Sequence, residues 1–362
     1  MIYKFLQPLI FRLEAEKAHN FAIAFLKYFP NLATLFVANK EYKNLSQRLC
    51  GLDFASPIGM AAGFDKNAEI IKSLHKFGFA FIEVGTVTPR PQLGNEQPRI
   101  FRLPEDKAII NRLGFNNEGA EIFAQNIAQT NDNVVLGINI GKNKDTKNAL
   151  TDYLFLLEKF YEKASYITLN ISSPNTKNLR DLQNEENLDE FLSQILAKKN
   201  VLQNKTKIIT PIFLKIAPDL DFKQQEMIAE IVLKHKIDAL IIANTTISRP
   251  QNLQNKNADK QGGLSGKPLF SKSNEVLKNF YQLTKRQIPL IGVGGIENAR
   301  DVYTKIKLGA SLVQIYSSLI YQGFGVVEKI KKELSEMVAK DGFENISQAI
   351  GVDNKFSKTQ NS

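Results

Sequence analysis

The chain has 362 residues, of which 43% are hydrophobic and 23% are charged, and its formal net charge is +10. This length suits one large α/β domain with an appendage, or two domains, and it allows a sizeable buried core. The single cysteine, Cys50, excludes an intrachain disulfide and argues against a cysteine-built metal site, so we interpret it as a buried apolar residue. We find no secretory segment at the amino end and no run near the roughly 18 apolar residues of a transmembrane helix, so we expect a reducing compartment.

Positive charge is concentrated at the amino end. Residues 1–48 contain seven Lys or Arg against three Glu and no Asp. Such an excess suits contact with nucleic acid, an anionic membrane or an acidic small molecule. Charge describes only the surrounding field, so it does not choose among these partners.

The first forty residues show helical periodicity and predict a small helical hairpin, which ends where Pro30 interrupts the pattern. Its apolar positions are Leu6, Leu9, Ile10 and Leu13, then Ala18, Phe21, Ala22, Phe25, Leu26 and Phe29. This apolar face either packs on the main domain, as most amphipathic helices do, or dips into the headgroup layer of a membrane. Periodicity leaves both interpretations open.

From about residue 55 short apolar runs alternate with helical segments. Eight strands are predicted, at residues 58–61, 79–85, 134–140, 166–170, 212–216, 239–243, 290–293 and 312–315. Helices are predicted between them, at residues 68–77, 118–128, 153–161, 188–196, 224–235, 274–283 and 298–308. Eightfold alternation predicts a closed parallel (β/α)8 TIM barrel. A doubly wound sheet is the main alternative, but it more often has a G-x-G-x-x-G turn after its first strand, which this chain lacks.

Two connections are longer than a barrel requires. Residues 88–112 contain "QPRIFRLPEDKAII", whose alternation suits a hairpin, and the polar, glycine-containing residues 246–270 suit a loop over the barrel mouth. Residues 341–362 are expected to form a polar tail, disordered over its end, "GVDNKFSKTQNS".

Polar residues follow several predicted strands, at the end where barrel enzymes keep their chemistry. In "AAGFDKN" small residues let the backbone approach a ligand, and Lys66 could meet an anion. Turn formation alone can explain Gly, Asn, Ser and Thr at such positions. Lys215 is harder to explain in this way, because it lies inside the apolar run "PIFLKIAP" and a buried ammonium is costly without a partner. We therefore expect Lys215 to project into the barrel mouth toward an electron-rich group.

The stretch "ASYITLNISSPNT", residues 164–176, ends a strand in two serines, a proline and an asparagine. It could be a simple turn, and Asn170-Ile171-Ser172 also fits an N-glycosylation pattern, although nothing indicates export. The functional interpretation places Ser173 at the carboxyl end of a barrel strand. Further on, "IPLIGVGGIENARD" and "SLVQIYSSL" follow the last two strands, where barrel enzymes often hold a phosphate on backbone N–H groups.

Together these motifs resemble the quinone-linked (class 2) dihydroorotate dehydrogenase family. The resemblance covers nearly the whole chain and runs through "SPIGMAAGFDKN", "EVGTVTPRPQLGNEQPRIFRL", "INRLGFNN", "GINIGKN", "LNISSPNT", "LKIAPDL", "ANTTISR", "GGLSGKPL", "IGVGGI" and "QIYSSLIYQG". It implies oxidation of (S)-dihydroorotate to orotate in pyrimidine (UMP) biosynthesis, with FMN as hydride acceptor and a membrane quinone as final acceptor. It also implies a peripheral protein on the cytoplasmic face of a cell membrane. Residues 1–45 would then give access to the quinone and residues 46–340 would form the barrel, with no metal and no nucleic-acid partner.

The resemblance also assigns residues to roles. Ser173 would be the general base that removes the C5 proton of the substrate while hydride passes from C6 to flavin N5, and Thr176 would help relay that proton. The implied FMN contacts are Ala62, Gly63, Lys66, Thr86, Asn139, Asn170, Lys215, Ala243, Gly266, Gly295, Tyr316 and Ser317. The implied substrate contacts are Lys66, Asn111, Arg112, Leu113, Gly114, Phe115, Asn170, Asn175, Asn244 and Thr245. The implied quinone contacts are His19, Arg102 and Tyr316.

Two features qualify these assignments. A lone histidine on an apolar helix is usually structural, which is the alternative for His19. At Ala243 relatives often have a hydroxyl residue, and we expect a minor effect because the backbone can make that contact.

Other protein classes fit the sequence less well. The soluble class of dihydroorotate dehydrogenases uses cysteine where this chain has Ser173. A tRNA dihydrouridine synthase is also a basic FMN barrel, but it should carry a catalytic cysteine in the corresponding loop and an RNA-binding carboxyl-terminal domain. A basic, non-enzymatic binding module would explain the charge but not Lys215, Ser173 or "GVGG".

Overall fold

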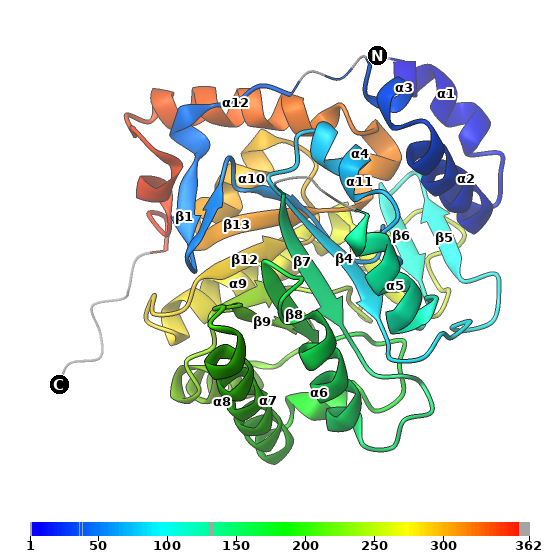
Figure 1. Ribbon diagram of the computed structural model, residues 1–362. Helices are drawn as coiled ribbons and strands as arrows, with labels where there is room; N and C mark the ends of the chain where they lie inside the picture. The colour runs from blue at the N-terminus through cyan, green and yellow to red at the C-terminus, as the bar shows by residue number, and fades with distance from the viewer. Residues whose placement is uncertain (1, 36, 38, 130–133, 355–362) are drawn as a thin grey trace.

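The computed structural model describes residues 2–35, 37, 39–129 and 134–354, and its centre is a closed barrel of eight parallel strands (Figure 1). The order around the barrel is β10-β12-β13-β3-β4-β7-β8-β9, and β9 pairs with β10 to close it. The strands are β3 (Ile58–Met60), β4 (Phe81–Val87), β7 (Val135–Ile140), β8 (Tyr166–Asn170), β9 (Ile212–Ile216), β10 (Ala239–Ile242), β12 (Leu290–Val293) and β13 (Ala310–Ile315). Each overlaps one predicted strand, so the TIM-barrel prediction is confirmed.

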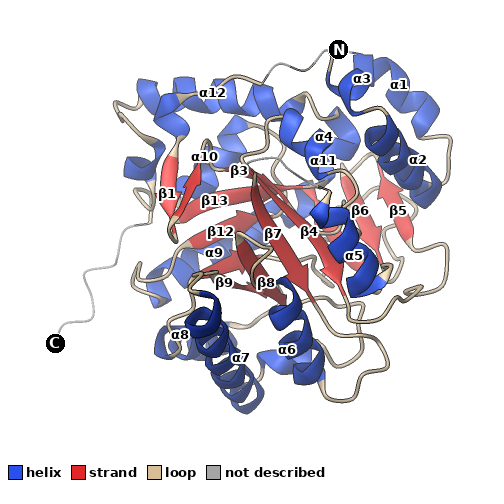
Figure 2. Cartoon of the chain, viewed as in Figure 1, coloured by secondary structure: helices blue, strands red, loops and turns tan. Residues whose placement is uncertain are grey.

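Helices surround the strands on the outside of the barrel (Figure 2). They are α4 (Ile71–Lys76), α5 (Gly119–Ala128), α6 (Ala149–Phe160), α7 (Glu185–Thr206), α8 (Phe222–Lys234), α9 (Phe270–Leu283), α10 (Ala299–Lys307), α11 (Ser317–Gln322) and α12 (Val326–Lys340). Their apolar faces pack inward, as Leu156, Leu157 and Phe160 of α6 do. The first seven overlap the predicted helices, whereas α11 and α12 were not predicted.

A hairpin that the sequence analysis did not predict, β1 (Gln47–Leu49) and β2 (Leu52–Phe54), packs against the aromatic layer inside the barrel. Phe54 meets Phe81 with ring centroids 5.3 Å apart. Cys50, in the turn of this hairpin, is half-buried rather than fully buried. Its thiol donates to the Asp238 carbonyl at 3.3 Å, and burial raises its pKa to about 12.

A separate antiparallel sheet contains β5 (Ile100–Leu103), β6 (Ala108–Asn111) and β11 (Gly263–Gly266). The predicted hairpin is therefore confirmed. Residues 246–270 are not all loop, because β11 pairs with β6 and Leu264 is fully buried between the two long connections. The remaining short turns are the 3-10 segments η1 (Lys43–Leu45), η2 (Arg180–Gln183), η3 (Lys267–Leu269) and η4 (Ile346–Ala349).

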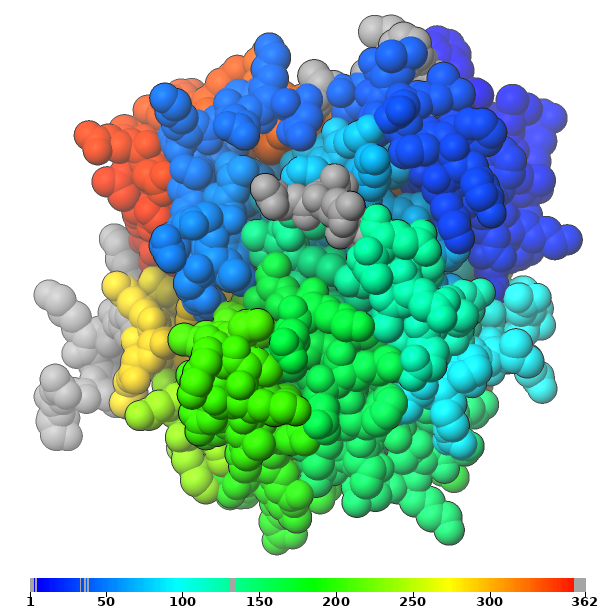
Figure 3. All heavy atoms as spheres, in the orientation of Figure 1, coloured from blue at the N-terminus to red at the C-terminus, as the bar shows by residue number. Residues whose placement is uncertain are grey.

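The amino-terminal part of the chain forms three helices at one side of the molecule (dark blue in Figure 3). They are α1 (Ile2–Ile10), α2 (Ala15–Tyr28) and α3 (Pro30–Thr34). A buried ion pair fixes α2 to the segment before β5, because the Glu16 carboxylate accepts from Arg99 Nη2 at 2.6 Å and each side chain is only 7% exposed. Burial opposes ionisation of Glu16, but the hydrogen bonds and charge of Arg99 outweigh it and lower the pKa of Glu16. Removing one partner of such a pair typically costs about 3–5 kcal/mol. No helix in the described residues has both the length and the apolar composition to cross a membrane.

The carboxyl end of the described chain is ordered where disorder was expected. Residues 351–354 fold back on the barrel helices, and the fully buried Asn354 donates from Nδ2 to the carbonyls of Lys278 at 3.0 Å and Leu308 at 2.8 Å. The prediction of disorder is therefore wrong for these four residues, since a buried amide needs partners and finds them here. Residues 355–362 lie outside the described part.

Candidate active site

One cavity of about 740 Å³ extends from the amino-terminal helices into the mouth of the barrel. It collects nearly all the residues that the sequence analysis assigned to a site. Those that line it are His19, Ala62, Gly63, Lys66, Thr86, Arg102, Asn111, Leu113, Gly114, Phe115, Asn170, Ser173, Asn175, Lys215, Ala243, Asn244, Thr245, Gly266, Gly295, Tyr316 and Ser317.

Three assigned residues, Asn139, Arg112 and Thr176, are absent from the cavity wall. Asn139 is fully buried behind Thr86, whose Oγ1 donates to Asn139 Oδ1 at 2.5 Å. The Arg112 guanidinium points elsewhere, because Nη2 donates to the Pro98 carbonyl at 3.0 Å and the group lies over the Phe101 ring. In this structure neither the Asn139 nor the Arg112 side chain reaches the cavity.

Below the cavity, inside the barrel, lies the carboxylate of Glu83, which is fully buried on β4. Lys215 Nζ is 3.8 Å from Glu83 Oε1. Hydrogen bonds reach the carboxylate from Asn139 Nδ2 at 2.7 Å, Gln314 Nε2 at 2.8 Å, Thr168 Oγ1 at 3.1 Å and the Tyr166 hydroxyl at 3.2 Å. Glu83 was not among the predicted site residues, although a charge inside the apolar run "FAFIEVGTV" is the same indication that identified Lys215.

Lys215 ends at the floor of the cavity, as expected from its place in an apolar strand. Its side chain is 6% exposed, and burial lowers the pKa of its ammonium, while the charge of Glu83 acts in the opposite direction. An ammonium that faces a cavity from such a site favours an electron-rich ligand group.

Another part of the wall is lined by amides and hydroxyls from the end of β6 and from the loops after β8 and β10. Asn175 Nδ2 donates to the Asn111 carbonyl at 3.1 Å, and Asn244 Nδ2 donates to Ser172 Oγ at 3.0 Å. Ser173 is 6% exposed, and its Oγ accepts from the Asn175 backbone N–H at 3.3 Å. These groups can both donate and accept, so together they suit a small ring with several polar edges.

Near Ser173 lies Thr176, which is 5% exposed. Its Oγ1 is buried without a hydrogen-bond partner among the described residues. Buried hydroxyls normally have partners, so this hydroxyl is available to a ligand, to water or to a proton in transit.

Glycines and serines form a cradle at another side of the cavity. Gly295 has φ of +74°, and a Cβ added there would lie 2.5 Å from Phe270 Cα, so only glycine fits. The Ser265 and Ser317 hydroxyls lie 3.0 Å apart, and the buried Ser318 Oγ has no partner among the described residues. A phosphate needs close backbone and hydroxyl groups, and the cradle offers both, so it fits a phosphorylated cofactor.

The end of the cavity between the helices is aromatic and apolar. The His19 ring meets Phe64 at 5.2 Å, and Phe64 meets Tyr316 at 5.8 Å between centroids. Burial, reinforced by the charge of Lys66, lowers the pKa of His19 to about 3, so its imidazole is neutral at neutral pH. Arg102 holds the end of α1, since it donates to the carbonyls of Ile10 and Phe11, both at 3.3 Å. This end suits an apolar ligand with a few polar atoms.

Comparison with known proteins shows similarity to dihydroorotate dehydrogenases. A family model described as dihydroorotate dehydrogenase matches residues 44–338. A protein of Bradyrhizobium sp. (strain ORS 278), named dihydroorotate dehydrogenase (quinone), is 44% identical over 348 residues, which is 96% of this chain and 94% of that protein. A protein of the same name from Nitrosomonas eutropha is 48% identical over 332 residues, covering 91% of this chain and 96% of that protein. The solved structure of DHODH from Eimeria tenella in complex with ferulenol has a TM-score of 0.88 and 37% identity, covering 94% of this chain and 96% of that one.

Lys66 should titrate in an accessible range. Desolvation of its ammonium lowers its pKa to about 8, the charge of Glu16 partly offsets this, and the charge of Arg99 lowers the pKa further. NMR of isotopically labelled lysines should show a signal titrating near pH 8 that is lost in Lys66→Met and is shifted to lower pH in Glu16→Gln. The surface variant Lys198→Met should leave the signal unchanged.

The same shift should make stability depend on pH. Because the unfolded chain keeps this proton up to about pH 10.5, the free energy of unfolding should gain a contribution that rises between pH 8 and 10.5. Titration of Lys66 only above pH 10 would contradict this account.

Proposed function

The chain belongs to the dihydroorotate dehydrogenase family, and from this we propose that it oxidises (S)-dihydroorotate to orotate and passes the electrons to a membrane quinone. The observation that carries the proposal is the continuous cavity, which joins the polar wall around Ser173 to the apolar end around His19. An anionic, polar ring fits the first environment, and an apolar electron acceptor fits the second.

We propose FMN as the cofactor at the barrel mouth. When bound, FMN supplies the acceptor for the hydride from substrate C6. The glycine and serine cradle at Gly295 and Ser317 would hold its phosphate, and Lys215 would face an electron-rich part of it. Thr86 and Asn170 line the same cavity, and the Asn170 amide donates to Thr86 Oγ1 at 3.0 Å, so both would be pre-positioned for polar contacts.

The polar wall would bind dihydroorotate. Asn111, Asn175, Asn244 and Thr245 offer donors and acceptors to its ring, and Lys66 offers a positive charge to its carboxylate. Ser173 Oγ would take the substrate C5 proton. A serine is a weak base in water, so this role needs the low solvent exposure found here and a neighbour that can receive the proton onward. The buried Thr176 hydroxyl is that neighbour in our proposal.

The amino-terminal helices would form the quinone entrance on the cytoplasmic face of a membrane. We propose that residues 1–45 are this extension, that residues 46–340 are the catalytic barrel, and that nucleic acid is no partner. Several large apolar side chains on these helices, and Phe29 between α2 and α3, are exposed. The exposed fractions are 76% for Phe5, 58% for Leu9, 65% for Phe21 and 54% for Phe29. An apolar surface with basic neighbours favours reversible attachment to anionic lipid.

The visible spectrum of the purified full-length protein tests the proposed reaction. We expect flavin absorbance after reconstitution with FMN, anaerobic bleaching by dihydroorotate, and reoxidation by a soluble quinone faster than by fumarate or NAD. A protein that remains colourless, or whose bound flavin does not respond to dihydroorotate, would refute the proposal. Faster reoxidation by fumarate would refute the quinone assignment alone.

Ser173→Ala tests the general base. The variant should retain FMN and bind orotate, but its flavin should be reduced about 10²- to 10⁴-fold more slowly, because no group at that position can take the proton. Ser173→Cys should recover part of the rate at higher pH, since a thiol ionises near pH 8.5. Stopped-flow reduction measures both, and near-normal reduction in the alanine variant would assign the proton to another group.

Substitution of exposed apolar residues tests membrane attachment. We expect the triple variant Phe5→Ser, Leu9→Ser and Phe29→Ser to bind anionic vesicles several-fold more weakly, because each change removes apolar surface that lipid would cover. Flavin reduction by dihydroorotate should be unchanged. Ile209→Ser, at a 70% exposed position outside the helices, is the control. If co-sedimentation with vesicles is equal for the triple variant and the control, the helices are not a membrane surface.

A further inference from the structure

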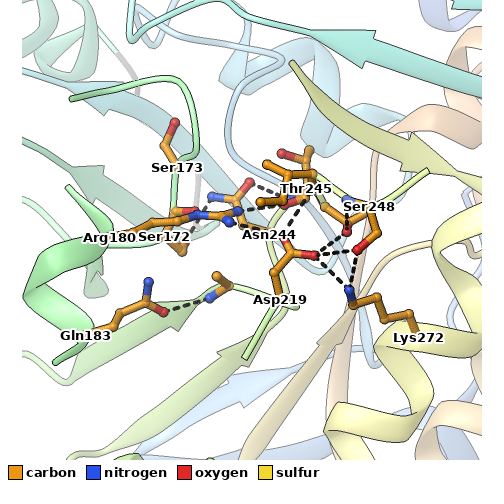
Figure 4. Close-up of polar contacts among 12 residues, drawn as sticks. Ser172, Ser173, Arg180, Gln183, Asp219, Asn244, Thr245, Ser248 and Lys272 are labelled. Atoms are coloured by element: carbon orange, nitrogen blue, oxygen red, sulfur yellow. Dashed lines mark hydrogen bonds and ion pairs between the residues drawn. The ribbon is translucent and has the colours of Figure 1, made fainter. Parts of the chain in front are cut away.

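Arg180 and Asp219 form a partly buried ion pair next to the polar wall, outside the residues assigned to it (Figure 4). Arg180 lies in η2 after β8, and Asp219 lies in the loop after β9. Arg180 Nη1 is 3.0 Å from Asp219 Oδ2, and the side chains are 23% and 9% exposed. Neither residue lines the cavity, and the proposed chemistry uses neither.

The guanidinium of Arg180 connects two loops of the site. Its Nε donates to the Ser172 carbonyl at 3.0 Å, and its Nη2 donates to the Thr245 carbonyl at 3.1 Å. Ser172 directly precedes Ser173, and Thr245 directly follows Asn244. The planar guanidinium therefore fixes the backbone beside Ser173, the proposed base, relative to the backbone beside Asn244, a proposed substrate contact. A lysine could not reproduce this, because its ammonium has no rigid fork of donors.

Asp219 in turn fixes the guanidinium. Its carboxylate also accepts from Lys272 Nζ at 2.8 Å, from the Ile247 backbone N–H at 2.9 Å, from Ser248 Oγ at 3.3 Å and from Thr246 Oγ1. Burial alone raises the pKa of Asp219, but the hydrogen bonds from Lys272, Thr246 and Ile247 outweigh it and hold the pKa at about 2. The carboxylate is therefore charged throughout the neutral range, and it joins the loops after β8, β9 and β10.

Ser173 itself points away from this pair. Figure 4 shows its hydroxyl directed away from Arg180 and Asp219, and the side chain lines the cavity. The pair therefore touches the backbone beside the proposed base and leaves the hydroxyl free to face a ligand.

We propose that Arg180 and Asp219 are positioning residues, which hold Ser173 and the Asn244–Thr245 segment at the separation that proton removal requires. This inference rests on the proposed function of Ser173. A displacement of about 1 Å in a catalytic group can cost about 10²-fold in rate. Loosening the pair should therefore slow flavin reduction. Reoxidation should be unaffected, because the aromatic end at His19 and Phe64 is built from other segments.

Two conservative variants of the full-length, FMN-loaded protein test the inference. Asp219→Asn keeps the shape and removes the charge, and Arg180→Lys keeps the charge and removes the fork. In anaerobic stopped-flow experiments both should reduce flavin about 10- to 100-fold more slowly with dihydroorotate. FMN content and reoxidation by a soluble quinone should stay within about twofold of the unmodified protein.

An exposed ion pair supplies the matched control. Arg90 and Asp145 are 2.7 Å apart, with side chains 62% and 71% exposed, and such pairs contribute little. Asp145→Asn should leave both half-reactions unchanged. The double variant Asp219→Asn/Arg180→Lys should reduce its flavin no more slowly than the slower of the two single variants, because both changes disable the same ion pair.

Three results would overturn the inference. One is flavin reduction within twofold of normal in both variants. Another is an equal slowing of reduction and reoxidation, which would indicate general damage. The third is a double variant whose loss is the product of the single losses. If Asp219→Asn does not fold, Arg180→Lys decides alone. Failure of the unmodified protein to be reduced by dihydroorotate would instead refute the proposed function, and this inference with it.

Discussion

The buried carboxylate of Glu83 is the constraint around which the site is arranged. A fully buried charge is tolerated only where hydrogen bonds and an opposite charge meet it. Here amide and hydroxyl donors from β7, β8 and β13 converge on it, and Lys215 of β9 approaches to 3.8 Å. Asn139, one of these donors, also accepts from Thr86 and from Asn170. Apolar packing inside the barrel thus gives way to a polar network, and this network forms the floor of the cavity.

Two further ion pairs fix the walls above that floor. Glu16 and Arg99 join the amino-terminal helices to the segment before β5, and Arg180 and Asp219 join the loops after β8 and β9. Both pairs are largely shielded from water, so the loss of one partner leaves a costly unpaired charge. Pairs on the surface, such as Arg90 with Asp145, are screened and constrain little. Ion pairs that are shielded from water therefore position the site, whereas exposed pairs constrain it little.

The polarity of the cavity changes along its length, and the proposed reaction depends on that change. Around Ser173 the wall offers amides and hydroxyls, which suit an anionic ring. Around His19 burial keeps the imidazole neutral and aromatic rings make the wall, which suits an apolar acceptor. Because the two environments share one cavity, two half-reactions with very different substrates can use a single cofactor between them.

The sequence alone determined the repeating architecture and much of the site. Strand and helix periodicities are local properties of the chain, so the eight strands were predicted to within a few residues. The burial of Lys215 also followed from its local apolar run, and the same reasoning could have found Glu83. Most residues that the motif resemblance named line the cavity, although the side chain of Arg112 points away from it. Tertiary structure decided which distant segments meet. The β6–β11 pairing, the Glu16–Arg99 pair across 83 residues and the Arg180–Asp219 pair have no local indication in the sequence. The partner of a charged side chain depends on which segments folding brings together, and periodicity within one segment carries no information about the other.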